Sequence, residues 1–171
     1  MRLAFVPLFL ALASPLAAQP RDNPQIDYRG FQALAQSVAP LRQTRLIGLA
    51  RFHAEAAHPR TLILDARSRE AFNAGHIEGA VNLPFSDFTA ESLAAAIGPD
   101  RARPILIYCN NNFSNNAAPV TRKLITVALN IQTFINLVGY GYRNVWELND
   151  VVDFNDPEVR WVAGQALRRN G

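Results

Sequence analysis

The stretch "LILDARSREAFNAGHIEGAVNLP", Leu62 to Pro84, carries a strand, a helix and a second strand in close succession. Apolar residues run without a polar interruption up to Asp65, which predicts a strand buried on both faces of a sheet. "SREAFNAG" predicts a short helix that ends at Gly75. "HIEGAVNLP" then predicts a turn and a short strand that ends at Pro84. This order is typical of a parallel α/β sheet.

The segments on either side repeat the same alternation. "RLIGLARFHAEAAHP" predicts a short strand and a helical turn, and "DFTAESLAAAIG" predicts a helix capped by Asp87 or Thr89. "PILIYC", which ends at Cys109, is another continuous apolar strand. Helices and strands alternate from about Leu46 to Leu148, so the sequence predicts an open α/β sheet with helices on both faces.

The first residues, "MRLAFVPLFLALASPLAA", have one positive charge, a short apolar run and then small residues. This pattern predicts a secretory signal peptide over residues 1–18 with cleavage after Ala18, because the run is too short for a spanning helix. The expected location is periplasmic or secreted. The alternative is an uncleaved anchor, in which case the protein would contact a membrane.

The flanks of the sheet define the remaining boundaries. Residues 19–45 predict an N-terminal extension with an amphipathic helix, since apolar residues recur every three to four positions from Ile26 to Leu46. The α/β domain covers residues 46–155. Residues 156–171 form a C-terminal tail, which we expect to begin with a helix on which Trp161 packs.

Composition limits the partners. The net charge is +3, and the basic residues, with Lys123 as the only lysine, are scattered among acidic ones. This distribution is typical of a mixed solvated surface and predicts no nucleic-acid partner. His53, His58 and His76 have no metal-ligand spacing, so we expect no metal and no cofactor.

Cys109 is the only cysteine and therefore cannot form an internal disulfide. It ends a strand, and "NAAPVTRKLITVAL" predicts a helix a few residues later, capped by Ser114 or Asn115. Loop amides and the helix dipole would there stabilise a thiolate near neutral pH. The alternative is a buried thiol that only packs, because cysteine is among the most buried residue types.

The opening stretch resembles the signature of rhodanese-like domains, and the likeness extends from about Leu46 to Leu148. "ILIYC" resembles the strand that leads into the rhodanese active-site loop, and "GYGYRNVWEL" resembles the segment that ends in the last sheet strand. The resemblance implies a parallel five-stranded sheet, a cradle-like loop after Cys109 and, in active members, a persulfide on that cysteine. The matching positions are Asp65, Arg67, Glu70, Phe72, Gly75, His76, Ile77, Gly79, Ala80, Asn82 and Pro84.

Within that signature, the resemblance assigns structural roles to Asp65, Arg67, Glu70, His76 and Gly79. We expect Arg67 to pair with Asp65 or Glu70, and the His76 ring to bond nearby backbone rather than act as a base. The catalytic residue implied is Cys109. The substrate-binding loop implied is Asn110, Asn111, Asn112, Phe113, Ser114 and Asn115.

The loop departs from the active pattern in its charge. Active rhodanese loops carry arginine one and five positions after the cysteine, and here those positions hold Asn110 and Ser114. Related phosphatase loops need arginine six positions after the cysteine to clamp phosphate, and Asn115 stands there. Arg122 is expected two turns inside the following helix, away from the sulfur. The sequence therefore disfavours phosphoryl transfer and predicts weak thiosulfate binding.

Three functions fit these patterns. The first is transfer or carriage of sulfane sulfur through Cys109, with a small sulfur donor and an acceptor thiol or protein as partners. The second is a non-catalytic binding module that docks a protein. The third is a redox sensor in which the same thiol is sulfenylated. Whether the chain is an enzyme is left open by the sequence.

Overall fold

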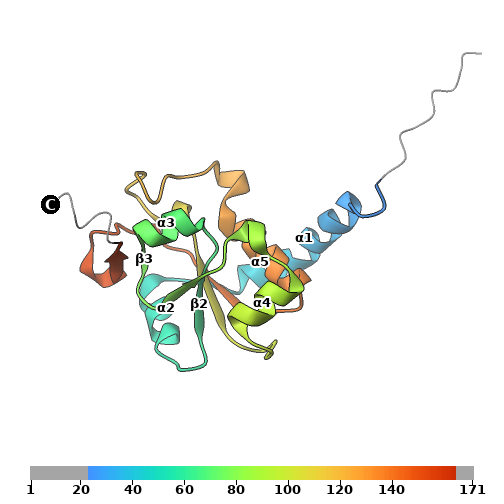
Figure 1. The fold of residues 1–171 in the computed structure, drawn as a ribbon, viewed down its shortest axis with the longest axis horizontal. Helices are drawn as coiled ribbons and strands as arrows, with labels where there is room; N and C mark the ends of the chain where they lie inside the picture. Colours follow the sequence, from blue (N-terminus) through green and yellow to red (C-terminus); the bar gives the residue numbers. More distant parts are fainter. Residues whose placement is uncertain (1–22, 165–171) are drawn as a thin grey trace, which may run out of the picture.

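The computed structural model describes residues 23–164 (Figure 1). The predicted signal peptide, its cleavage point after Ala18 and the end of the tail lie outside the described residues.

A five-stranded parallel sheet forms the centre of the domain, as predicted. The strand order is β1-β6-β5-β2-β4, and every neighbouring pair is parallel. All residues of β2 and β5 are buried, because helices or loops cover both faces. The strands of this sheet are β1 (Leu46–Ile47), β2 (Leu62–Asp65), β4 (Ala80–Asn82), β5 (Ile105–Tyr108) and β6 (Val145–Leu148).

Helices divide between the two faces of the sheet (Figure 1). One hydrophobic core joins α1, α4 and α5 to alternate residues of β2 and β5, such as Leu64 and Ile107. The other core packs Phe52 of α2 and the loop residue Phe113 against the opposite face. The helices are α1 (Tyr28–Gln43), α2 (Leu49–Ala56), α3 (Arg69–Ala74), α4 (Ala90–Ile97) and α5 (Leu129–Gly139).

Helix boundaries follow local sequence signals where caps are present. Thr89 caps α4 through a reciprocal hydrogen-bond pair with Ser92, and Ser68 accepts the amide of Ala71 at the start of α3. The helix predicted in the N-terminal extension is α1. Its first turns project beyond the sheet (Figure 1) and carry exposed apolar side chains, including Tyr28 and Phe31.

The helix expected directly after the Cys109 loop is absent. Asn110–Asn112 forms one 3-10 turn, and the next α-helix, α5, begins only at Leu129. Between these two elements, side-chain amides bond the backbone in place of helical hydrogen bonds. Asn110 donates to the carbonyl of Thr121. Asn111 donates to the carbonyl of Lys123 and accepts from its backbone N–H. We call residues 116–124 the strap.

The prediction that the tail begins with a helix is also wrong. Pro157–Val159 is a single 3-10 turn, which ends at Arg160 in the left-handed conformation. The chain then forms β7 (Trp161–Ala163), antiparallel to β3 (Gly75–Ile77). Trp161 still packs as expected, stacked on Phe154 and edge-on to Phe113.

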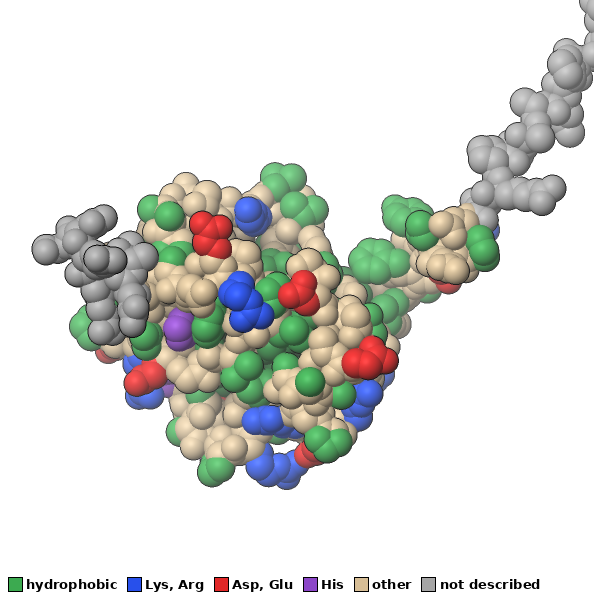
Figure 2. Space-filling view, in the orientation of Figure 1, with side chains coloured by type: hydrophobic (Ala, Val, Ile, Leu, Met, Phe, Trp, Pro, Cys, Tyr) green, Lys and Arg blue, Asp and Glu red, His purple; other side chains and the backbone are tan. Residues whose placement is uncertain are grey.

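No helix within residues 23–164 is long and apolar enough to cross a lipid bilayer. Figure 2 shows basic and acidic side chains interspersed on the visible face, without a large patch of one sign.

Candidate functional site

A buried cluster of charged and polar side chains lies at the carboxyl end of β2. Asp65 and Arg67 form a paired contact, with Nη2 to Oδ2 at 2.5 Å and Nε to Oδ1 at 3.0 Å. The Tyr108 hydroxyl donates to the same carboxylate at 2.6 Å. Burial, reinforced by the charge of Asp65, raises the pKa of Tyr108. We call Asp65, Arg67 and Tyr108 the buried frame; it confirms the expected partner of Arg67.

Of the other signature residues, His76 bonds nearby backbone as expected. His76 Nδ1 lies 2.9 Å from the carbonyl of Phe72, and the two rings stack at 3.9 Å. Gly79 has φ +79, a conformation that favours glycine, in the turn between β3 and β4. Glu70 lies in the first turn of α3 and is exposed. None of these side chains lines the cavity beside Cys109.

Cys109 follows β5 directly and is 1% exposed. Its backbone N–H donates to Asn112 Oδ1 at 2.9 Å, and the backbone N–H of Asn112 donates to the Cys109 carbonyl at 3.1 Å. The sulfur therefore occupies a fixed position at the carboxyl edge of the sheet, where ligands bind in open α/β folds.

Backbone amides from two separate segments lie near this sulfur and act to lower the pKa of the thiol. They belong to Asn130 and Leu129, at the start of α5, and to Asn111 in the loop. A helix N-terminus thus reaches Cys109, but it is α5 rather than a helix that follows the loop at once. Burial nevertheless raises the pKa of the Cys109 thiol, with a smaller contribution from the charge of Glu147. The expectation of a populated thiolate near neutral pH is wrong for the resting protein.

A second charged cluster lies on the far side of the cysteine. Arg42, from the last turn of α1, forms a bidentate pair with Glu147 of β6, with both distances at 2.6 Å. Asn130 Nδ2 donates to Glu147 Oε1 at 3.3 Å and to Asn112 Oδ1 at 3.0 Å. We call Arg42, Glu147, Asn130 and Asn112 the cysteine network, since Asn112 bonds the Cys109 backbone.

Cys109 and this network line one cavity of about 540 Å³, which we call the Cys109 cavity. Its polar wall includes Arg42, Glu147 and Arg122, and its apolar wall includes Ile125 and Ile131. The prediction that Arg122 lies away from the cysteine is wrong, because the strap is not helical and brings this side chain to the cavity. Sequence reasoning missed Arg42 and Glu147, since no local pattern marks a contact between α1 and β6.

The predicted binding loop divides among different roles. Asn111 and Asn112 line the Cys109 cavity, whereas Asn110 lines a separate one. Phe113 is fully buried against Tyr108 and Trp161. Ser114 and Asn115 bond the segment after β6, at Val152 and Asp153. The loop is therefore less a single cradle than a junction between the sheet, the strap and the tail.

The described residues contain no group of side chains with the arrangement of a metal site. Within residues 23–164, no three His, Cys, Asp or Glu side chains are grouped so that they could hold an ion.

Comparison with known proteins identifies the family to which this chain is similar. The model of the family described as rhodanese-like domain matches residues 49–150, more than half of the chain. A relative from Gallus gallus, TBC domain-containing protein kinase-like protein, is 38% identical over 67 residues, which cover 39% of this chain. That matching stretch spans only 6% of the Gallus gallus protein.

Two of the solved structures that match this chain come from bacteria. Thiosulfate sulfurtransferase from Pseudomonas aeruginosa has a TM-score of 0.49 and 19% identity, covering 79% of this chain and 23% of that one. The rhodanese-like domain of the Alr3790 protein from Anabaena sp. has a TM-score of 0.42 and 23% identity, covering 61% of this chain and 67% of that one.

Proposed function

This chain belongs to the rhodanese-like domain family, and we propose that it carries sulfane sulfur on Cys109 as a persulfide. One observation carries the proposal: Cys109 lines a cavity, and backbone amides from the loop and from the start of α5 lie close enough to its thiol to lower the pKa. Amides in that arrangement stabilise an anion that forms at the sulfur.

The chemical step needs the thiolate, which is the minor form of a buried thiol. The Cys109 thiolate attacks the outer sulfur of a donor persulfide, R–S–S⁻, and forms a new S–S bond. The S–S bond of the donor breaks, and R–S⁻ leaves with the electron pair. Cys109 then holds –S–S⁻, and an acceptor thiolate takes the terminal sulfur in the reverse sense, so no external oxidant or reductant is needed.

Organic persulfides fit this cavity better than thiosulfate does. The charges on its wall are Arg42, Arg122 and Glu147, and Arg42 is already paired with Glu147. A dianion therefore meets one uncompensated cation, Arg122. A cavity of about 540 Å³ also leaves most of its volume empty around an inorganic ion, whereas apolar side chains such as Ile125 and Ile131 can contact an organic stem.

Intact-mass measurement tests the proposal. The reduced protein is incubated separately with thiosulfate, inorganic polysulfide and a small organic persulfide, beside an active rhodanese as a positive control. We expect an increment of one sulfur atom on Cys109, fastest with the organic persulfide. The Cys109→Ser variant should gain none. If every donor labels the control rhodanese and none labels this protein, sulfur carriage is excluded.

A second candidate, a non-catalytic binding module, is favoured by exposed apolar side chains at the mouth of the Cys109 cavity. Ile125 is 77% exposed, Val151 is 65% exposed, and both line the cavity. This candidate predicts that Cys109→Ser preserves the phenotype of the wild-type gene, whereas sulfur carriage predicts the phenotype of a deletion. A thiol sensor would instead react faster with peroxide than with any sulfur donor.

We also propose export through the signal peptide of residues 1–18. The support is the charged, apolar and small-residue order of that segment. N-terminal sequencing of protein purified from the periplasm or medium should begin at Gln19. Recovery of the chain in the cytoplasm with Met1 retained would contradict export.

A further inference from the structure

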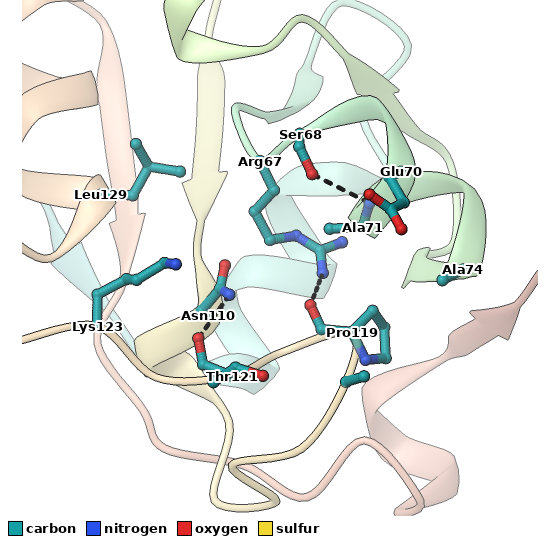
Figure 3. A pocket seen from close by; sticks show the side chains of 11 residues that line it. Arg67, Ser68, Glu70, Ala71, Ala74, Asn110, Pro119, Thr121, Lys123 and Leu129 are labelled. Carbon is teal, nitrogen blue, oxygen red and sulfur yellow. Dashed lines mark hydrogen bonds between the residues drawn. The ribbon is translucent and has the colours of Figure 1, made fainter.

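A second cavity, of about 410 Å³, lies between α3 and the strap (Figure 3). No residue lines both this cavity and the Cys109 cavity. Pockets that take small ligands span roughly 300–1,000 Å³, so this one is large enough for a compact organic molecule. We call it the strap cavity.

The strap cavity has opposite charges on opposite walls. Figure 3 shows Lys123 on the strap side and Glu70 on the α3 side, with Arg67 and Asn110 between them. Neither Lys123 nor Glu70 has an ion-pair partner among residues 23–164. Because the two side chains form no ion pair with each other, both are available to a ligand that carries one positive and one negative charge.

Between the two charges, the cavity presents a buried donor and a buried acceptor. Arg67 is 2% exposed, and its Nε and Nη2 bond Asp65 and Gly75, whereas Nη1 has only a 3.4 Å contact with the carbonyl of Pro119. Asn110 is 9% exposed and donates through Nδ2 to Thr121, so its Oδ1 is left without a donor among the described residues.

A peptide bond offers the complementary pair, one C=O and one N–H. We propose that the strap cavity binds a di- or tripeptide with free ends. The peptide carboxylate lies at Lys123 and the ammonium at Glu70. The amide between them bonds Arg67 Nη1 and Asn110 Oδ1. Apolar side chains of the peptide contact Ala71, Ala74 and Leu129 on the wall. This assignment goes beyond sulfur carriage and does not depend on it.

Calorimetric titration with matched ligands tests the assignment. The probes are L-alanyl-L-leucine, its N-acetyl derivative, which lacks the ammonium, and its C-terminal amide, which lacks the carboxylate. We expect saturable binding of the free dipeptide and about tenfold weaker binding of each derivative, because each loses one charge-assisted contact. Absence of saturable dipeptide binding, or equal binding of all three probes, would overturn the proposal.

Two exposed positions provide variants that leave the fold intact. In Glu70→Gln, the N-acetyl derivative should bind about as well as the free dipeptide, and in Lys123→Gln the same should hold for the C-terminal amide. Unchanged discrimination in both variants contradicts the assigned orientation. Cys109→Ser should bind the dipeptide with unchanged affinity. A loss of affinity in that variant would place the peptide in the Cys109 cavity and overturn the assignment.

Discussion

Two charged clusters flank the carboxyl edge of the sheet, and they differ in access to solvent. In the buried frame, the side chains of Arg67 and Asp65 are 2% and 0% exposed. In the cysteine network, those of Arg42 and Glu147 are 30% and 7% exposed, and both line the Cys109 cavity. Both pairs are bidentate, so geometry alone does not separate them.

The difference in access assigns different roles to the two clusters. The carboxylate of Asp65 is saturated by Arg67 and Tyr108 and has no route to a ligand in the Cys109 cavity. Glu147 faces the cavity, and its charge contributes to the raised pKa of Cys109. We therefore expect the buried frame to control the free energy of unfolding and the cysteine network to control the reactivity of the thiol.

The largest effect is expected from Arg67→Met. The variant leaves the buried Asp65 carboxylate without its cation, which costs about 3–5 kcal/mol of the free energy of unfolding. Urea denaturation followed by circular dichroism measures the loss. The matched control is Arg69→Met at the exposed start of α3, which should change stability by less than about 0.5 kcal/mol. An equal loss of unfolding free energy in Arg67→Met and Arg69→Met would contradict the stabilising role of the buried frame.

A smaller loss is expected from Arg42→Met. Glu147 loses two hydrogen bonds but keeps Asn130 and remains open to solvent through the cavity, so we expect about 1–3 kcal/mol. Arg29→Met, exposed in the same helix, is the control. If Arg42→Met destabilises the protein as much as Arg67→Met does, the cysteine network is a structural cluster of the same kind.

The pH dependence of thiol alkylation separates the clusters without unfolding. Only the thiolate reacts, so the rate rises with pH through the pKa of Cys109, which burial places above its ordinary value. Glu147→Gln removes a negative charge that opposes ionisation, and the midpoint should move to lower pH. Arg42→Met removes the neutralising charge, and the midpoint should move to higher pH. Movement in the same direction in both variants would contradict this electrostatic account.

The smallest effect on stability is expected from Arg122→Ala. This exposed side chain has no ion-pair partner among residues 23–164, so the unfolding free energy should change by less than about 0.5 kcal/mol. Sulfuration of Cys109 by thiosulfate should nevertheless slow, because Arg122 is the unpaired cation of the cavity. A neutral alkylating reagent is the control and should react at the wild-type rate.

Within the buried frame, the pair of Asp65 and Arg67 was predictable because its signals are local, whereas the contact with Tyr108 was not predicted. Asp65 and Arg67 follow an apolar strand at once, and the family resemblance placed both in a structural motif. Thr89, as one of two candidate caps, marked the start of α4 for the same reason. These contacts join residues that are close in sequence or in adjacent strands.

The cysteine network was not predictable, because distant segments assemble it. Arg42 comes from an extension that precedes the family match, and Glu147 lies within an otherwise apolar strand. A helix was predicted for the strap because its residues favour helix formation. The prediction did not account for the side-chain amides of Asn110 and Asn111, which hydrogen-bond the strap backbone. That error displaced Arg122 from the site and assigned Cys109 the wrong helix N-terminus.

Localisation of the transferred sulfur tests the central claim most directly. The protein is exposed to an organic persulfide, trapped with an alkylating reagent and digested, and the peptide that contains Cys109 is weighed. We predict that this peptide carries one additional sulfur atom beneath the alkyl group, in the wild type and in Arg69→Met alike. Complete alkylation of Cys109 with no sulfur increment at any pH would show an accessible thiol that does not carry sulfur, and would contradict the account.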